Sequence, residues 1–155
     1  MRRTLLLPLI ALTLAACATE TTSPATAGVV ASYIAAVPAQ GSAGPPYGAL
    51  VVTTTKGGVI SELPVAGAEI RLVLDASGST TGRVFIPAAA TGTGANVDAD
   101  LVGTWSLADG IVTLHQTADT FLRDMPLTVQ GDGLVGDRTF DGTRVRLTLV
   151  RQVAP

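Results

Sequence analysis

Turn-forming residues divide the chain between Tyr47 and Arg151 into short apolar runs, and their spacing limits the folds that are possible. Glycine, Asp-Gly and proline signals recur every ~8 to 12 residues, the interval expected between the strands of a sandwich or a barrel. The runs are rich in β-branched residues, and none has the length and period of an extended helix. Without long crossover segments, the strands are expected to follow one another as an antiparallel meander.

Within two of these runs, apolar and polar side chains alternate as in a strand with one buried face. The expected buried faces consist of Ile70, Leu72 and Leu74 in one run and of Val145, Leu147 and Leu149 in the last. Asp-Gly pairs at residues 109–110 and 141–142 tolerate the positive φ of tight hairpin turns. The pattern predicts an all-β domain over residues 43–155, an up-and-down antiparallel meander that closes into a small barrel of about eight strands.

The same pattern gives an expected structure for several other segments. Residues 68–75 and 80–87 flank a glycine-containing turn and are predicted to form a hairpin. Residues 91–100 are predicted to be a loop, and residues 119–124 a short strand. Residues 29–40 are apolar enough for a short helix or an early strand, and both alternatives stay open.

The first 16 residues have the composition of a secretory signal peptide. Two arginines follow Met1, and residues 5–14 form an apolar run that is too short to cross a bilayer as a helix. Small and apolar residues then precede Cys17, the single cysteine of the 155-residue chain. With one cysteine, the chain cannot form an internal disulfide.

Leu14-Ala15-Ala16-Cys17 resembles the lipobox of bacterial lipoproteins. This resemblance implies that Cys17 is diacylated on sulfur, becomes the first residue of the mature chain and is acylated again on its amino group. Several acyl chains anchor a protein more durably than one, because each buried methylene contributes ~0.8 kcal/mol. Residues 17–42 are then interpreted as the lipidated N-terminus and a flexible tether that is rich in small polar residues.

The expected location is the bacterial cell envelope, where the lipid would hold the protein on a membrane that it does not span. Ala18 is not the aspartate that retains many enteric lipoproteins on the inner membrane. In a cell with two membranes, we therefore expect the protein on the outer membrane, facing the periplasm.

Charge argues against nucleic acid as a partner. Removal of residues 1–16 takes away two arginines and no acids, so 10 basic against 12 acidic residues become 8 against 12. The mature chain is mildly acidic and has no basic footprint for a phosphate backbone.

Gly103-Thr104-Trp105 matches the Gly-x-Trp motif that opens the first barrel strand of lipocalins. Residues 47–151, about two-thirds of the chain, resemble the small lipocalin-like domains of bacterial lipoproteins. The resemblance implies a small barrel that can hold an apolar molecule. Here the motif follows three expected strands, so the lipocalin position of the tryptophan is not carried over. Trp105 is interpreted as a core aromatic residue and is also the candidate for a ligand contact.

Two motifs resemble ligand sites but lack the context that those sites need. Residues 131–136 match the dinucleotide pattern GxGxxG, yet a β-rich segment follows where a helix N-terminus should hold the pyrophosphate. These glycines are interpreted as turn and strand-bulge positions. Asn96, Asp98 and Asp100 alternate as in a calcium loop, but leucines occupy its glycine and glutamate positions, so a solvated loop is expected instead.

The sequence offers no recognisable catalytic set. His115 is the single histidine, and Cys17 is assigned to lipid, so the His and Cys cluster of a zinc or iron site is missing. No Gly-x-Ser-x-Gly elbow occurs, and the carboxylates are scattered through turns and outer strand faces. We expect a noncatalytic protein with no catalytic residues, no cofactor and no metal.

Two hypotheses for function remain. The first is a lipid-anchored envelope lipoprotein whose barrel binds a small hydrophobic ligand. The alternative is an envelope protein-interaction or structural module with a filled barrel and no small-molecule ligand. Inward residues as large as Ile70 and Leu147 favour a filled interior, because a barrel of eight strands has little room beyond its own side chains.

Overall fold

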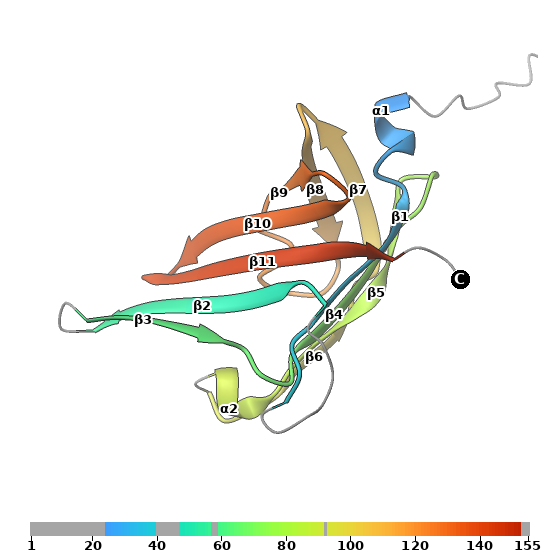
Figure 1. The fold of residues 1–155 in the computed structure, drawn as a ribbon. Helices are drawn as coiled ribbons and strands as arrows, with labels where there is room; N and C mark the ends of the chain where they lie inside the picture. The colour runs from blue at the N-terminus through green and yellow to red at the C-terminus, as the bar shows by residue number, and fades with distance from the viewer. Residues whose placement is uncertain (1–23, 40–46, 57–58, 92, 153–155) are drawn as a thin grey trace, which may run out of the picture.

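Alternating side chains and glycine-containing turns give eleven strands and two one-turn helices in the described part of the chain (Figure 1). The computed structural model describes residues 24–39, 47–56, 59–91 and 93–152. The helices are α1 (Pro24–Ala27) and α2 (Ala88–Thr91). The strands are β1 (Ala31–Ala36), β2 (Ala49–Lys56), β3 (Val59–Pro64), β4 (Glu69–Leu74), β5 (Ser79–Ile86), β6 (Val97–Asp100), β7 (Gly103–Ala108), β8 (Ile111–Gln116), β9 (Leu127–Gln130), β10 (Gly133–Phe140) and β11 (Thr143–Gln152).

Eight of these strands form a closed antiparallel barrel in the order β1-β4-β5-β7-β8-β9-β10-β11, with β11 pairing back onto β1. The all-β, up-and-down barrel that the sequence predicts is therefore confirmed. Three strands lie outside this ring. The β2–β3 hairpin is attached to it through β2 and β11, and β6 is attached through β5.

The tight turns have the backbone conformation that their residues favour. At the β7–β8 turn, φ is 52° at Asp109 and 75° at Gly110, and at the β10–β11 turn it is 45° at Asp141 and 80° at Gly142. Positive φ at both central residues matches the twist of the flanking strands. The predicted hairpin of residues 68–75 and 80–87 is also confirmed, as β4 and β5.

The barrel begins earlier in the chain than the sequence indicated. β1 closes the ring between β4 and β11, and its Tyr33 and Ala35 are 4% and 2% exposed. The expectation that residues 17–42 form a tether and that the domain begins at residue 43 is therefore wrong for β1 and for α1. The alternation of β1 was hidden because Ile34, between its two core-facing residues, is apolar and buried as well.

Two further segments differ from their expected structure. Residues 97–100 form β6 and not a loop; the outward Asp98 accepts hydrogen bonds of 2.7 and 2.6 Å from Arg83 on β5. Residues 119–124 form turns and not a strand, because Leu122 enters the core from a segment that pairs with no neighbouring strand. In both segments, the tertiary surroundings decide the conformation more than the residue pattern of the segment itself.

Large aliphatic side chains fill the interior of the barrel. Those with less than 2% of their surface exposed are Leu50, Ile70, Leu72, Leu74, Leu101, Leu114, Leu122, Met125, Leu127, Leu134, Leu147 and Leu149. They include five of the six side chains that the alternating runs assigned to the buried face; the sixth, Val145, is half-buried. Burial of this apolar surface is the main contribution to the stability of the fold.

Candidate functional site

The two ends of the barrel differ in how their strands pair. Near α1, Ala31 of β1 pairs with Leu74 of β4, and residues 150–152 of β11 pair with β1. Toward α2, residues 144–148 of β11 pair with β2 instead, and residues 83–86 of β5 leave β7 and pair with β6. The sheet therefore opens at the α2 end, where Figure 1 shows the β2–β3 hairpin reaching away from the ring and α2 below it.

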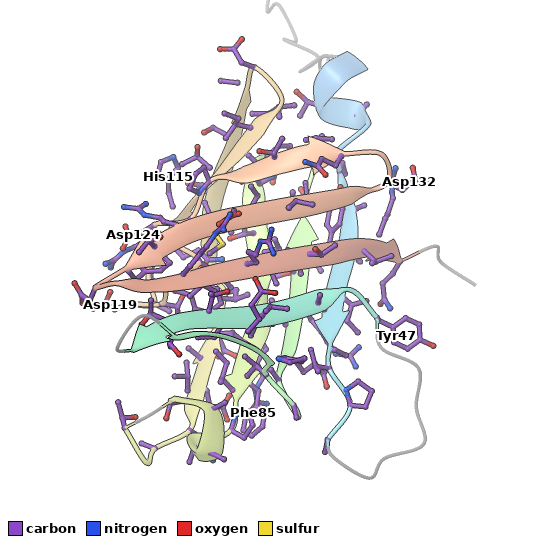
Figure 2. The ribbon with its side chains drawn as sticks, turned by 60° about the vertical axis from the view of Figure 1, so that its left-hand side comes forward. Tyr47, Phe85, His115, Asp119, Asp124 and Asp132 are labelled. Atoms are coloured by element: carbon purple, nitrogen blue, oxygen red, sulfur yellow. The ribbon has the colours of Figure 1, made fainter. Side chains whose placement is uncertain are left out.

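Residues 117–126, here called the plug, close the barrel interior beneath this opening. β9 pairs with β8 at residues 111–112 and with β10 at residues 133–136, so beyond these points the plug occupies the space between the two strands. Its Leu122 and Met125 are 0% and 1% exposed. Gly136 makes room for Met125, because a Cβ atom at that position would lie 2.3 Å from the Met125 sulfur. Figure 2 shows Asp119 and Asp124 of the plug beside the ends of β10 and β11.

An open apolar groove lies above the plug, between β2, β11 and α2, and is here called the mouth groove. Its first lobe has a volume of about 260 Å³ and is lined by twelve described residues, nine of them apolar and none charged. Phe121 and Phe140 form its aromatic part. The aliphatic part consists of Leu50, Val52, Val65, Ile86, Ala90, Val97 and Val145, and the hydroxyl-bearing part of Thr91, Thr93 and Thr143.

A second lobe of about 390 Å³ continues the groove along the β2–β3 hairpin. The two lobes share Val52, Val65 and Ala90, so they form one elongated depression. The far end of the second lobe is lined by Pro64, Ala66 and Ala89. Exposed apolar surface that is contiguous and concave is typical of a binding site.

The aromatic end of the groove has one cation close to it. The rings of Phe121 and Phe140 meet edge to face, with centroids 6.4 Å apart and an interplanar angle of 78°. The Arg138 guanidinium carbon lies 5.4 Å from the centroid of the Phe140 ring. Arg138 and Phe140 share one face of β10, the face that carries the buried Leu134 further along the strand. This end of the groove therefore combines an apolar floor with a positive rim.

Four other arginines of the sheet, Arg71, Arg83, Arg144 and Arg146, lie on its outer face. Arg144 donates hydrogen bonds of 2.7 and 2.5 Å to Asp137, and these bonds hold the pKa of the Asp137 carboxyl below its usual value. A hollow of about 330 Å³ on the outer face of β4 and β5 contains Arg71 and Arg83. Arg71 is paired with Glu69, and Arg83 with Asp98, whose pKa is lowered by that hydrogen bond. These cations already have carboxylate partners, so the hollow offers little to a ligand.

Trp105 does not line the mouth groove. It is 7% exposed, and its indole Nε1 donates a hydrogen bond of 2.9 Å to the carbonyl oxygen of Asp75. Asp75 follows β4 directly, at the α1 end of the barrel, so Trp105 packs at the end opposite the groove. Cys17, the expected lipidation site, lies outside the described residues.

The residues of the rejected motifs have structural partners. The Asn96 side-chain oxygen accepts a hydrogen bond of 2.7 Å from the backbone N–H of Ala88, at the start of α2. Gly131 has a φ of 56° in the β9–β10 turn, whereas Gly136 lies in regular strand pairing and is not a bulge. Within residues 24–39, 47–56, 59–91 and 93–152, no three His, Cys, Asp or Glu side chains come together as a metal site would need.

Sequence reasoning did not find Phe121, Phe140 or Arg138. The one available signal was the spacing of Arg138 and Phe140, which places both on the inner face of a strand whose other inner positions are apolar. The remaining lining comes from distant elements that only the fold brings together.

Of the described helices, neither has the length and apolar character needed to cross a membrane. Comparison of the chain with protein-family models, curated proteins and solved structures found no match. The resemblances to the lipobox and to lipocalins therefore remain predictions from the sequence.

Proposed function

We propose that this protein is a noncatalytic, lipid-anchored protein of the bacterial cell envelope that binds a small apolar molecule in the mouth groove. The lining of the first lobe supports the binding part of the proposal: nine of its twelve described residues are apolar, and none is charged. Small-molecule sites are concave and mostly apolar in this way. The proposed ligand lies at the mouth and not inside the barrel, because aliphatic side chains fill the interior.

The filled interior also favours a second candidate function. A barrel that is packed with its own leucines can serve as a structural or protein-interaction module without any small ligand. The two candidates differ at the mouth groove, because only the first requires an apolar molecule there.

The point where the described chain enters the barrel and the groove lie toward opposite ends of the fold. The chain enters the barrel through α1, whereas the groove lies beside α2 (Figure 1). A lipid on Cys17 would therefore leave the groove at the end of the barrel that is farther from the point where the chain enters.

Fractionation of cells tests the anchor. Cys17→Ala is expected to move the protein from the membrane fraction to the soluble fraction and to abolish labelling by palmitate, because the acylated thiol is lost. Thr19→Ala, a substitution in the same segment, is the control and should leave both unchanged. Unchanged fractionation of Cys17→Ala would exclude the lipoprotein assignment.

Native mass spectrometry of the protein purified from its cells tests the ligand. We expect a small molecule to copurify with the wild type and to be lost from Ala90→Trp, because Ala90 is exposed and lines both lobes. Ala27→Trp introduces the same side chain at an exposed position of α1 and is the control. A stoichiometric protein partner with no small molecule would instead support the second candidate.

A further inference from the structure

The shape of the mouth groove suits an elongated apolar chain. Its two lobes are continuous through Val52, Val65 and Ala90, and they extend from the Phe121–Phe140 pair to Pro64 and Ala66. The plug separates this depression from the filled interior, so a long occupant would lie along the groove and not enter the barrel. A flexible single chain can follow such a depression with little contact to the charged outer faces.

The two ends of the groove differ in charge. Arg138 stacks over the ring of Phe140 at the aromatic end, whereas the lining at the other end consists of uncharged residues such as Pro64 and Ala89. Among the arginines in the described ranges, Arg138 is the one whose guanidinium has neither a carboxylate within 4.0 Å nor a carbonyl as a hydrogen-bond partner there. Its donors are therefore available to a ligand.

Two acids of the plug at the same rim lie close to a cation other than Arg138. In the plug, Asp119 accepts a hydrogen bond of 2.6 Å from Arg123, which also lies 3.7 Å from Asp124. On β11, Arg146 and Arg144 pair with Asp137 on the outer face and not at the groove. Among the described arginines, Arg138 is thus the one that lies unpaired beside the apolar floor.

We propose that the mouth groove binds a single-chain amphiphile with a carboxylate head, whose alkyl chain lies along the two lobes and whose head pairs with Arg138. The planar guanidinium can bind both carboxylate oxygens while its face stays on the Phe140 ring. The inference rests on the proposed function, since it names the chemical class of the apolar ligand. The observation that supports it is the Arg138 guanidinium at one end of a groove whose described lining is uncharged.

Calorimetric titration with three ten-carbon compounds tests this inference. Decanoate, decanol and decyltrimethylammonium share the chain and differ in the charge of the head. They are titrated into the full chain carrying Cys17→Ser, which removes the thiol to be acylated. We expect decanoate to bind about tenfold more tightly than decanol, because a hydrogen bond to a charged group is added. Decyltrimethylammonium is expected to bind most weakly.

Substitutions locate the head group. Arg138→Gln is expected to remove the preference for decanoate while decanol binds as before, and Arg138→Lys should keep part of the preference. Arg146→Gln removes the same charge from the outer face and is the control, which should keep the full preference. Equal binding of decanoate and decanol, a preference that survives Arg138→Gln, or tighter binding of the cationic compound would each overturn the inference.

The same titrations separate this inference from the proposed function. If decanol and decanoate bind equally and both are lost in Ala90→Trp, the groove binds apolar molecules and only the role of Arg138 fails. If neither compound binds, or if binding is unchanged in Ala90→Trp, the proposed function fails as well. Sedimentation of the same samples measures whether the protein is a dimer. If the wild type is a dimer and Ala90→Trp is a monomer, the groove binds a second copy of the chain.

Discussion

The α1 end and the α2 end of the barrel are built from the same strands, yet one is closed and the other is open. At the α1 end, β1 pairs with both β4 and β11 and closes the ring, and the Trp105 indole donates a hydrogen bond to the Asp75 carbonyl oxygen in the β4–β5 turn. At the α2 end, β11 pairs with β2 in place of β1, β5 pairs with β6 in place of β7, and the plug fills the space that β9 leaves. Because β11 and β5 change partners at the α2 end, the wall of the barrel is interrupted there and a groove forms.

This difference separates stability from binding within one small domain. At the closed end, Leu74 and Trp105 are 1% and 7% exposed, whereas Phe121, Phe140 and Val145 at the open end are half-buried and form a surface that a ligand can reach. Substitutions at the closed end should therefore change mainly the free energy of unfolding. Those at the open end should change mainly affinity.

Among the changes considered, deletion of β1 should destabilise the fold most, because it would open the α1 end of the barrel as well. A chain that begins at residue 43 leaves β4 and the end of β11 each without a partner on one side and exposes Ile70 and Leu72. We expect it to lose cooperative thermal unfolding, measured by far-ultraviolet circular dichroism. A chain that begins at residue 24 retains β1 and is the control. Cooperative unfolding of the shorter chain would show that β1 is dispensable for closure.

The two ends can be compared directly by removing one aromatic side chain from each. Trp105→Ala is expected to lower the free energy of unfolding by about 3 to 5 kcal/mol, because a buried ring and its hydrogen bond are lost. Phe140→Ala should lower it by about 1 to 2 kcal/mol, since Phe140 is half-buried. Urea denaturation measures both. Equal losses would contradict the assignment of stability to the closed end.

The sequence predicted those strands whose own side chains alternate between core and solvent. The faces of β4 and β11 could be identified because leucine and isoleucine alternate there with arginine and other polar residues. β1 carries the apolar Ile34 on its outer face, and β6 is a short acidic strand that depends on Arg83 of its partner. In these two strands the local alternation of side chains is weak, so pairing with the neighbouring strand determines the extended conformation.

The candidate site was less accessible to sequence reasoning than the fold. The mouth groove takes residues from β2, α2, the plug, β10 and β11, which are far apart in the chain. No local spacing encodes such a surface, because it arises where the ring opens. Trp105, the residue that a short motif suggested, lies instead at the closed end.

Two glycines allow a smaller test of how rigid each region is. At Gly82, with a φ of 147°, a Cβ atom would lie 2.0 Å from the backbone oxygen of Arg71 on the paired strand. At Gly136 it would meet the flexible side chain of Met125. We expect Gly82→Ala to destabilise the protein by about 3 kcal/mol and Gly136→Ala by about 1 kcal/mol, because only the second obstacle can move. Thermal denaturation of both variants measures the difference.

For ligand affinity we expect the opposite order, with the larger effect in Gly136→Ala. Displacement of Met125 in Gly136→Ala moves the plug beneath the mouth groove, so decanol affinity should change in this variant and not in Gly82→Ala. A plug that tolerates Gly136→Ala without any change in stability or affinity would show that it does not support the groove.

Acid should produce the smallest effect, and it acts on the outer faces at both ends. Hydrogen bonds from Ser77 lower the pKa of Asp75 near the α1 end, and those from Arg144 lower the pKa of Asp137 near the α2 end. A carboxyl whose pKa is lower in the folded than in the unfolded chain stabilises the fold above the unfolded value, and this contribution is lost as the pH falls through the folded value. Both groups are solvent-accessible, so each contribution is small.

We expect the Tm to fall slightly between pH 5 and pH 3, a range set around the ordinary aspartate pKa of about 3.9. The decrease should be smaller in Asp75→Asn and in Asp137→Asn than in the wild type, and salt should reduce it further. A steeper decrease in either variant would mean that the carboxylate destabilises its end of the barrel, contrary to the pairing seen on the outer face.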